Sequence, residues 1–387
     1  MRIVDISCRK ILNSNTNYTI EVKVHTGDGI FRGSSPAGES TSQYEVKQFK
    51  LSLDSTVSKF NAFISKLKGR EIVSMNDIYS IEREVPEEFI GGPSLSLSYA
   101  LMYALSYSLK QEPYQLLGGK HTVLPICKMI GGGVHTSDLG MDIQEILVTT
   151  LSDNLEESLD GTIAVYNEVK RLLSEKTLSY LGAVDPEGGL VSALDNYESL
   201  KIVDKAVGNV IERTGLDIRM GIDAAASTFY RDEKYVYKKP LYGKKELTRQ
   251  EQIDLMIKLA NEFNLYYVED PVDENFSEGY KEIMNHIDGY VVADDLTATE
   301  TERLERLHGS INATLIKPNQ VGLVWKFVEY SKLADKYNLL KIVSHRSEET
   351  NIGILSDIAV GLGARHIKIG INRGERIEKL NRLMELE

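Results

Sequence analysis

The sequence predicts a (β/α) barrel that follows a smaller region of strands and helices, and two observations support this fold class. From about residue 200 onward, apolar runs alternate with segments of helical periodicity, which is typical of parallel strands covered by helices. The polar residues that mark successive runs lie 46, 25, 23, 28 and 23 residues apart, which suits one strand and one helix per interval. A doubly wound sheet is the alternative, but nothing in the chain resembles its GxGxxG opening.

Residues 1–120 are expected to form strands first and helices afterwards. The segment Thr19–Val24 alternates apolar and polar residues, as a half-exposed antiparallel strand does. Asp28-Gly29 is a hairpin signal, and the extended pattern resumes at Ile30–Arg32. An antiparallel hairpin is therefore predicted near the start of the chain.

The rest of this first region predicts a loop and then helices. Residues 33–43 are small, polar or turn-forming, which favours a loop. From Tyr44 onward the pattern predicts helices, the last of them over Leu95–Leu109. We therefore expect an α+β domain at 1–120 and the barrel domain at 121–387.

Six apolar runs are expected to be barrel strands: Ile218–Asp223, Leu265–Asp270, Tyr290–Asp295, Ala313–Lys317, Leu340–His345 and His366–Gly370. Between the first two, a helix is predicted over 249–263, with Thr248 and Glu251 as a capping box. The first interval is longest because Arg231–Lys245 is inserted there.

Composition excludes several classes of protein. The 387 residues carry a net charge of −12, which argues against non-specific binding to nucleic acid or to an anionic membrane. Only Cys8 and Cys127 are present, so a disulfide framework or a thiolate zinc site is not expected. No signal peptide and no apolar run long enough to span a membrane are predicted, so the expected location is cytoplasmic.

Polar residues gather where the predicted strands end. Asp223, Glu269, Asp294, Lys317 and His345 each mark the end of an apolar run, and in a parallel barrel those ends share the face that carries active sites. The alternative is that single polar residues only cap the next helix. Three neighbouring carboxylates would repel one another, so a cation is expected between them. Oxygen ligands with room for water and substrate favour Mg²⁺.

Two lysines and a group of acidic residues complete the candidate site. Lys317 could act as a general base if the metal and Lys368 lowered its pKa, although an ion pair with a carboxylate is an equally good interpretation of either lysine. Gln144, Glu145 and Glu187 are further candidates, and Glu187 precedes two glycines that would let the backbone approach a ligand.

The motifs resemble those of the enolase family (phosphopyruvate hydratase) over nearly the whole chain. In the first half of the chain the matching segments are Ser35–Thr41, Gly131–His135, Asp142–Glu145 and Glu187–Gly189. In the second half they are Gly221–Ser227, Val268–Pro271, Ala293–Leu296, Leu315–Gln320, Val343–Ser347, Ile367–Gly370 and Arg373–Arg376. The resemblance implies a modified (β/α)8 barrel of the ββαα(βα)6 type, behind an α+β capping domain in which residues 33–43 form a mobile loop.

By this resemblance the chain would dehydrate 2-phosphoglycerate to phosphoenolpyruvate, a step of glycolysis and gluconeogenesis, as a homodimer or higher homo-oligomer with two Mg²⁺ ions per site. The first ion would be held by Asp223, Glu269 and Asp294, and the second would be joined by Ser40. The catalytic residues would be Lys317 as base, Glu187 and Glu145 as proton donors to the leaving hydroxyl, and His135 from a closing loop. Substrate contacts would come from Lys368, Arg346, Ser347, His345, Gln144 and Ser40.

Some positions depart from the family pattern. Asn15 replaces an arginine that normally faces the site, and Ala37, Glu39 and Ser42 are unusual in the mobile loop. Pro186 interrupts the usual Asp-Glu-Gly-Gly, and Glu348 stands where the family has glycine, beside the phosphate contacts. A carboxylate there would repel phosphate unless it turned outward. The alternative hypothesis is therefore a related protein with a changed phosphate pocket, which acts on another carboxylate or only binds a ligand.

Overall fold

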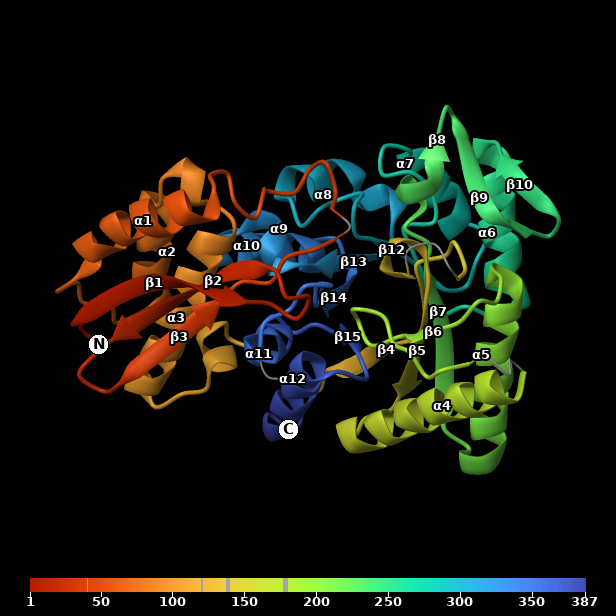
Figure 1. Cartoon of the computed structure of the whole chain (residues 1–387), viewed down its shortest axis with the longest axis horizontal. Helices are drawn as coiled ribbons and strands as arrows, with labels where there is room; N and C mark the ends of the chain where they lie inside the picture. The colour runs from red at the N-terminus through yellow and green to blue at the C-terminus, as the bar shows by residue number, and fades with distance from the viewer. Residues whose placement is uncertain (40, 120, 137–139, 177–179) are drawn as a thin grey trace.

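The computed structural model describes residues 1–39, 41–119, 121–136, 140–176 and 180–387. The N-terminal part is an antiparallel sheet of three strands in the order β1-β2-β3 with three α-helices (Figure 1). The strands are β1 (Asp5–Leu12), β2 (Tyr18–His25) and β3 (Ile30–Ser34), and the helices are α1 (Leu53–Ile64), α2 (Met75–Glu84) and α3 (Gly92–Leu109). The hairpin predicted around Asp28-Gly29 is confirmed by the pairing of β2 with β3.

A closed barrel of eight strands follows within the described part of the chain. Its strands are β4 (Leu124–Gly131), β5 (Glu145–Leu151), β7 (Asp217–Asp223), β11 (Tyr267–Glu269), β12 (Tyr290–Ala293), β13 (Ala313–Ile316), β14 (Leu340–Ser344) and β15 (His366–Gly370). Strand β15 pairs with β4 and closes the ring, and only β5 runs antiparallel to its neighbours.

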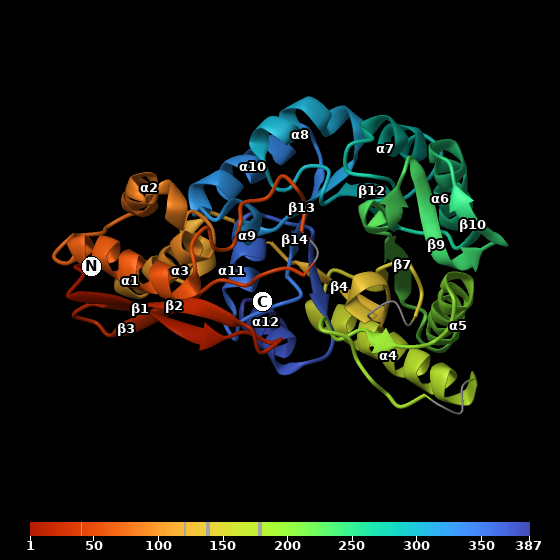
Figure 2. The same ribbon diagram turned by 45° about the horizontal axis from the view of Figure 1, so that its top comes forward.

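Helices surround the barrel on its outside (Figures 1 and 2). They are α4 (Leu155–Lys176), α5 (Asn196–Thr214), α6 (Arg249–Glu262), α7 (Ser277–Met284), α8 (Thr301–Leu307), α9 (Pro318–Val321), α10 (Val324–Lys336), α11 (Ile354–Gly361) and α12 (Gly374–Glu385). The order of elements is ββαα followed by six βα units, so the predicted modified barrel is confirmed. The insertion before α6 forms a small sheet of β8 (Tyr230–Arg231), β9 (Lys234–Leu241) and β10 (Lys244–Leu247), and the two-residue β6 (Leu190–Val191) pairs with β4.

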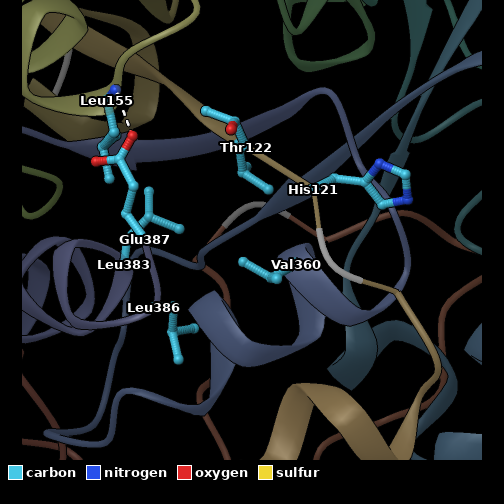
Figure 3. A pocket seen from close by; sticks show the side chains of 8 residues that line it. His121, Thr122, Leu155, Val360, Leu383, Leu386 and Glu387 are labelled. Carbon is cyan, nitrogen blue, oxygen red and sulfur yellow. Dashed lines mark hydrogen bonds between the residues drawn. The ribbon is translucent and has the colours of Figure 1, made fainter.

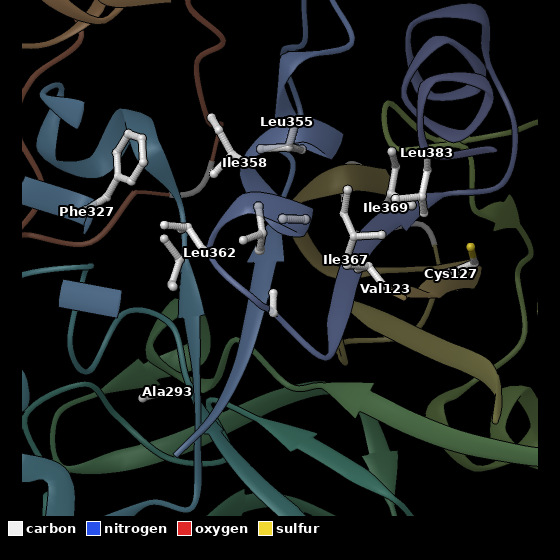
Figure 4. Packing of buried hydrophobic residues seen from close by; sticks show 14 of the residues in the cluster. Val123, Cys127, Ala293, Phe327, Leu355, Ile358, Leu362, Ile367, Ile369 and Leu383 are labelled. Atoms are coloured by element: carbon white, nitrogen blue, oxygen red, sulfur yellow. The ribbon is translucent and has the colours of Figure 1, made fainter. Parts of the chain in front are cut away.

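The apolar side chains of the barrel strands point alternately outward and inward and so form two apolar layers. On the outside, Ile367 and Ile369 of β15 lie among side chains of α11 and α12, including Ile358 and Leu383 (Figure 4). Inside the barrel, a separate apolar cluster is formed by Ile126, Leu147, Tyr267, Val292, Ala313, Leu315 and Ile342. Because this inner cluster fills part of the barrel, the charged side chains of the strands are left to gather at one end.

The helix expected from Tyr44 begins later than predicted, and this expectation was wrong. Helix α1 starts at Leu53, behind the N-cap Ser52, and residues 44–52 are irregular. The backbone N–H of Val46 donates to the carbonyl of Gln320 in the barrel, at 2.8 Å, so contacts with the barrel take the place of helical hydrogen bonds. The boundary at residue 120 stays a prediction. No described helix combines the length and the apolar character needed to cross a bilayer.

A buried carboxylate joins the capping helices to the barrel. Glu82 of α2 is 2% exposed and accepts hydrogen bonds from Ser98 Oγ at 2.5 Å, from Val324 N at 2.7 Å and from Trp325 N at 3.1 Å. It therefore caps the N-terminus of α10 from another domain. Burial raises the pKa of Glu82 to about 7, although its hydrogen bonds act in the opposite direction.

This carboxylate predicts a pH-dependent stability. The pKa in the folded state is about 7 and the usual pKa of a glutamate side chain is 4.5, so the folded chain binds the proton more tightly. The contribution of Glu82 is then fully present below about pH 4.5 and is lost as the pH rises through about 7. We expect the unfolding free energy of wild type minus that of Glu82→Gln to fall by about 3 kcal/mol between pH 4 and pH 8. The chain has one tryptophan, so Trp325 fluorescence during urea unfolding provides the measurement, and a difference independent of pH would contradict it.

Candidate active site

The polar ends of the barrel strands surround one cavity, as predicted. It is lined by His135, Gln144, Glu145, Glu187, Asp223, Ala225, Asp270, Asp294, Asp295, Lys317, Ser344, His345, Arg346, Ser347 and Lys368. Glu269 is completely buried beside Lys368. The structure therefore brings together every predicted site residue that it describes, while Ser40 lies outside the described residues.

Lys368 is the centre of the carboxylate cluster. Its Nζ lies 2.7 Å from Glu269 Oε2, 2.9 Å from Asp223 Oδ2 and 3.3 Å from Glu145 Oε1. Burial alone would lower the pKa of Lys368, but these carboxylates raise it well above its usual value. Lys368 is thus a permanent cation at the floor of the cavity, and Gln144 Nε2 approaches the same Asp223 oxygen at 3.5 Å.

Lys317 stands at the end of β13 and donates a hydrogen bond to Asp294. Burial would lower the pKa of Lys317, but Asp294 outweighs it and raises the pKa, which is opposite to the shift that a base requires. The other Asp294 oxygen accepts from Gln320 Nε2 at 3.0 Å. The alternative interpretation, a lysine in an ion pair, therefore describes the contacts of both lysines, although both also line the cavity.

One buried oxygen of Glu269 fits a metal ligand. Glu269 Oε2 accepts hydrogen bonds from Lys368 and from the hydroxyl of Tyr267, whereas Oε1 is buried without a hydrogen-bond partner among the residues that the structure describes. Burial, followed by the charge of Asp223, raises the pKa of Glu269 well above its usual value. A fully buried carboxylate oxygen in this state is stabilised by a cation, so the residues present fit the expected Mg²⁺.

Two further carboxylates of the site were not predicted. Asp270, Asp294 and Asp295 place one oxygen each within 4.8 Å of one another, so they could also hold a metal ion. Burial and then Asp294 raise the pKa of Asp270 to about 7. Asp270 and Asp295 directly follow the predicted ligands Glu269 and Asp294, so the doubled acidic residues were a visible signal. The sequence alone did not show that Asp270 and Asp295 would also line the cavity.

A second group surrounds Lys128 of β4, which was not predicted, and it includes the predicted residues Glu187 and His135. Lys128 Nζ lies 2.7 Å from Asp185 Oδ2, 3.0 Å from Glu187 Oε2 and 2.8 Å from His135 Nδ1. Burial would raise the pKa of Glu187, but the ammonium of Lys128 holds it well below its usual value. By contrast, burial raises the pKa of Glu145 to about 8. The two neighbouring carboxyls therefore differ in their tendency to keep a proton.

The capping domain supplies a partner for Arg346. The guanidinium of Arg346 is buried, and its two terminal nitrogens lie 2.9 and 3.2 Å from the carboxylate oxygens of Glu45. A Cβ on Gly38 would lie only 1.9 Å from Arg346 Nη2, so the loop backbone approaches the guanidinium closely. Ser347 Oγ accepts from the backbone N–H of Glu39 at 2.8 Å. The loop thus contacts both predicted phosphate-binding residues.

Glu348 is held away from the cavity. Its oxygens accept hydrogen bonds from Asn13 Nδ2 at 2.6 Å and from Asn17 Nδ2 at 2.8 Å, and Glu348 is absent from the described cavity lining. Its backbone forms an antiparallel bridge with Ala37. Likewise, Asn15 donates to Glu39 at 2.8 Å. The two unusual carboxylates, Glu348 and Glu39, are therefore both hydrogen-bonded to asparagines near the start of the chain.

A second cavity, of about 220 Å³, lies near the start of β4 and is mostly apolar (Figure 3). Among its described lining residues, His121 and Glu387 alone are ionisable. Glu387 Oε1 already accepts a hydrogen bond from Leu155 N at 3.0 Å. This cavity lacks the converging charges of the first one, which we therefore take as the candidate active site.

The chain is similar over its full length to proteins named enolase. The family profile described as "Enolase, C-terminal TIM barrel domain" matches residues 121–387. The chain is 33% identical to an enolase of Methanothermobacter thermautotrophicus, over 100% of this chain and 96% of that protein. It is 34% identical to an enolase of Methanosphaera stadtmanae with the same coverage, and 33% identical to one of Methanocorpusculum labreanum over 100% of this chain and 98% of that protein.

The contact between Tyr267 and Glu269 predicts a role in metal affinity. The Tyr267→Phe variant removes a hydrogen bond that orients the Glu269 carboxylate, so we expect Mn²⁺ or Mg²⁺ to bind about tenfold more weakly. Titration calorimetry of the variant and the wild type measures this. Tyr237→Phe is a matched control, because Tyr237 is equally buried and donates to Gln252 instead. Equal metal affinity in Tyr267→Phe and wild type would contradict this role.

Proposed function

This chain belongs to the enolase family and is a hydro-lyase, and from that premise we propose that it converts 2-phosphoglycerate to phosphoenolpyruvate and water with the help of Mg²⁺. The observation that carries the proposal is the arrangement of one cavity. Lys317 lines it together with Glu145 and Glu187, and Lys368 and Arg346 provide cations for an anionic substrate. A base, a carboxyl that keeps its proton and anion-binding groups are what the elimination of water next to a carboxylate requires.

The metal would be held by Asp223, Glu269 and Asp294, and the free oxygen of Glu269 supports this assignment. When bound, the ion supplies positive charge that stabilises the charge developing on the substrate carboxylate and that competes with Lys317 for Asp294. Three points stay predictions. They are the contact of Ser40 with a second ion, the homodimer or higher homo-oligomer, and the cytoplasmic location.

In the proposed reaction Lys317 removes the proton from the carbon next to the carboxylate. The electron pair moves into the carboxylate and returns as the bond to the hydroxyl breaks. The leaving hydroxide takes up a proton from the Glu145 and Glu187 pair, and Glu145 is the member that retains a proton near neutral pH. Lys368 would contact the substrate carboxylate, and Arg346 with Ser347 its phosphate. His135, His345 and Gln144 would line the pocket.

The first test is phosphoenolpyruvate formation from 2-phosphoglycerate, followed by ultraviolet absorbance with and without Mg²⁺. We expect turnover that disappears with a chelator. Glu269→Ala and Asp294→Ala should abolish it, and Lys317→Ala should reduce kcat by about 10²–10⁴-fold because the base is removed. The exposed Lys201→Ala serves as a control. If the wild type never forms phosphoenolpyruvate, the alternative of a related protein with another substrate or a binding role takes the place of this proposal.

The second test concerns Glu348, whose carboxylate is bound to asparagines. Because this charge already points away from the substrate, we expect Glu348→Gly to leave kcat/KM unchanged or lower, while the unfolding free energy falls by about 1–3 kcal/mol. Urea unfolding and the same absorbance assay measure the two effects. A clear gain in kcat/KM would mean that Glu348 repels the phosphate.

A further inference from the structure

We infer that Lys128 and Asp185 form a buried clamp that fixes Glu187 for the departure of the hydroxyl group. This inference rests on the proposed function and adds a positioning residue to it. Lys128 is 1% exposed and is absent from the described lining of the cavity, so it acts through other residues. Its ammonium contacts Asp185 at 2.7 Å and Glu187 at 3.0 Å, and both carboxylates are buried.

The clamp holds Glu187 at two points. One oxygen of Asp185, Oδ1, accepts hydrogen bonds from the backbone N–H of Glu187 at 2.8 Å and of Gly189 at 2.9 Å. The other oxygen, Oδ2, contacts Lys128, which in turn binds the side chain of Glu187. The backbone and the carboxylate of Glu187 are therefore both held by the ion pair of Lys128 and Asp185. If the Glu187 side chain turned away, Lys128 would lose a partner of its buried charge, which costs free energy.

The surrounding backbone is built to admit this pair. A Cβ at Gly131 would lie 1.9 Å from Asp185 Oδ2 and 3.2 Å from Lys128 Cε. A Cβ at Gly189 would lie 2.8 Å from Lys128 Cγ and 3.1 Å from the nitrogen of Gly131. Glycine at both positions leaves the space that the lysine and aspartate occupy, so the clamp is part of the fold rather than a chance surface contact.

Lys128 also fixes the protonation of His135. An ammonium group can only donate, so His135 Nδ1 must accept the 2.8 Å hydrogen bond and the imidazole proton resides on Nε2. Burial lowers the pKa of His135 to about 4, in agreement with a neutral ring. The proton balance of the elimination is unaffected, since Lys317 gains one proton and the Glu145 and Glu187 pair gives one to the hydroxide. Lys128 keeps its own protons throughout.

The experiment separates the two halves of the reaction. Removal of the proton by Lys317 is followed as exchange of the C2 hydrogen of 2-phosphoglycerate in D₂O by NMR, and loss of hydroxide is followed as phosphoenolpyruvate. In Lys128→Met we expect phosphoenolpyruvate formation to fall about 100-fold or more, while C2 exchange stays within about threefold of wild type. In Asp185→Asn, which retains the shape and the turn-capping oxygen, we expect the same direction with a smaller loss.

Two controls keep the outcomes distinct. Lys341→Met removes another buried lysine that binds Ser331 and Asp335 away from the site, and it should change stability without changing the ratio of the two rates. If Lys128→Met fails to fold, the ratio of C2 exchange to phosphoenolpyruvate formation in Asp185→Asn tests the clamp instead. The clamp is overturned if the variant that decides loses both rates equally or neither. The proposed function is overturned instead if the wild type shows neither exchange nor phosphoenolpyruvate.

Discussion

Charge compensation in a closed space is the constraint on which this site depends. Three carboxylates contact the single ammonium of Lys368. Asp294 forms an ion pair with Lys317, and Glu187 forms one with Lys128. Lys368 and Lys128 are buried and the side chain of Lys317 is only 14% exposed, so separating these pairs into water would carry a large cost. The protein thus fixes the positions of its charges before any substrate arrives, which is the form of electrostatic preorganisation that lowers barriers in enzymes.

The capping domain completes the site as well as covering it. Glu45 binds Arg346 from across the domain boundary, and Ala37 pairs with Glu348 on the segment that follows the predicted phosphate contacts. Figure 2 shows the chain after β3 running from the small sheet toward the ends of β13 and β14. Together with Glu82 at the start of α10, these contacts make the position of the small domain a determinant of the pocket.

The sequence was sufficient for the barrel and for the residues at its strand ends. Asp223, Glu269 and Lys317 were selected because each closes an apolar run on the face of the predicted barrel that carries active sites, and because Glu269 and Lys317 are poor helix caps. Lys128 was missed because it lies within such a run, and its partners at Asp185 and Glu187 are distant in sequence. The outward direction of Glu348 could not be predicted either, because it depends on Asn13 and Asn17, which lie 335 and 331 residues earlier in the chain.

The reversed strand β5 has a consequence for how this architecture could be altered. Parallel strands such as β7 and β11 offer the site their last residues, Asp223 and Glu269, whereas β5 offers its first residue, Glu145, which pairs with Asp223. The chain reaches Glu145 from the segment that carries His135, and the described residues 140–144 between them form no helix. Residues 136–144 therefore connect two residues of the site, His135 and Glu145. This connection could be replaced in an engineered variant without changing the helices that surround the barrel.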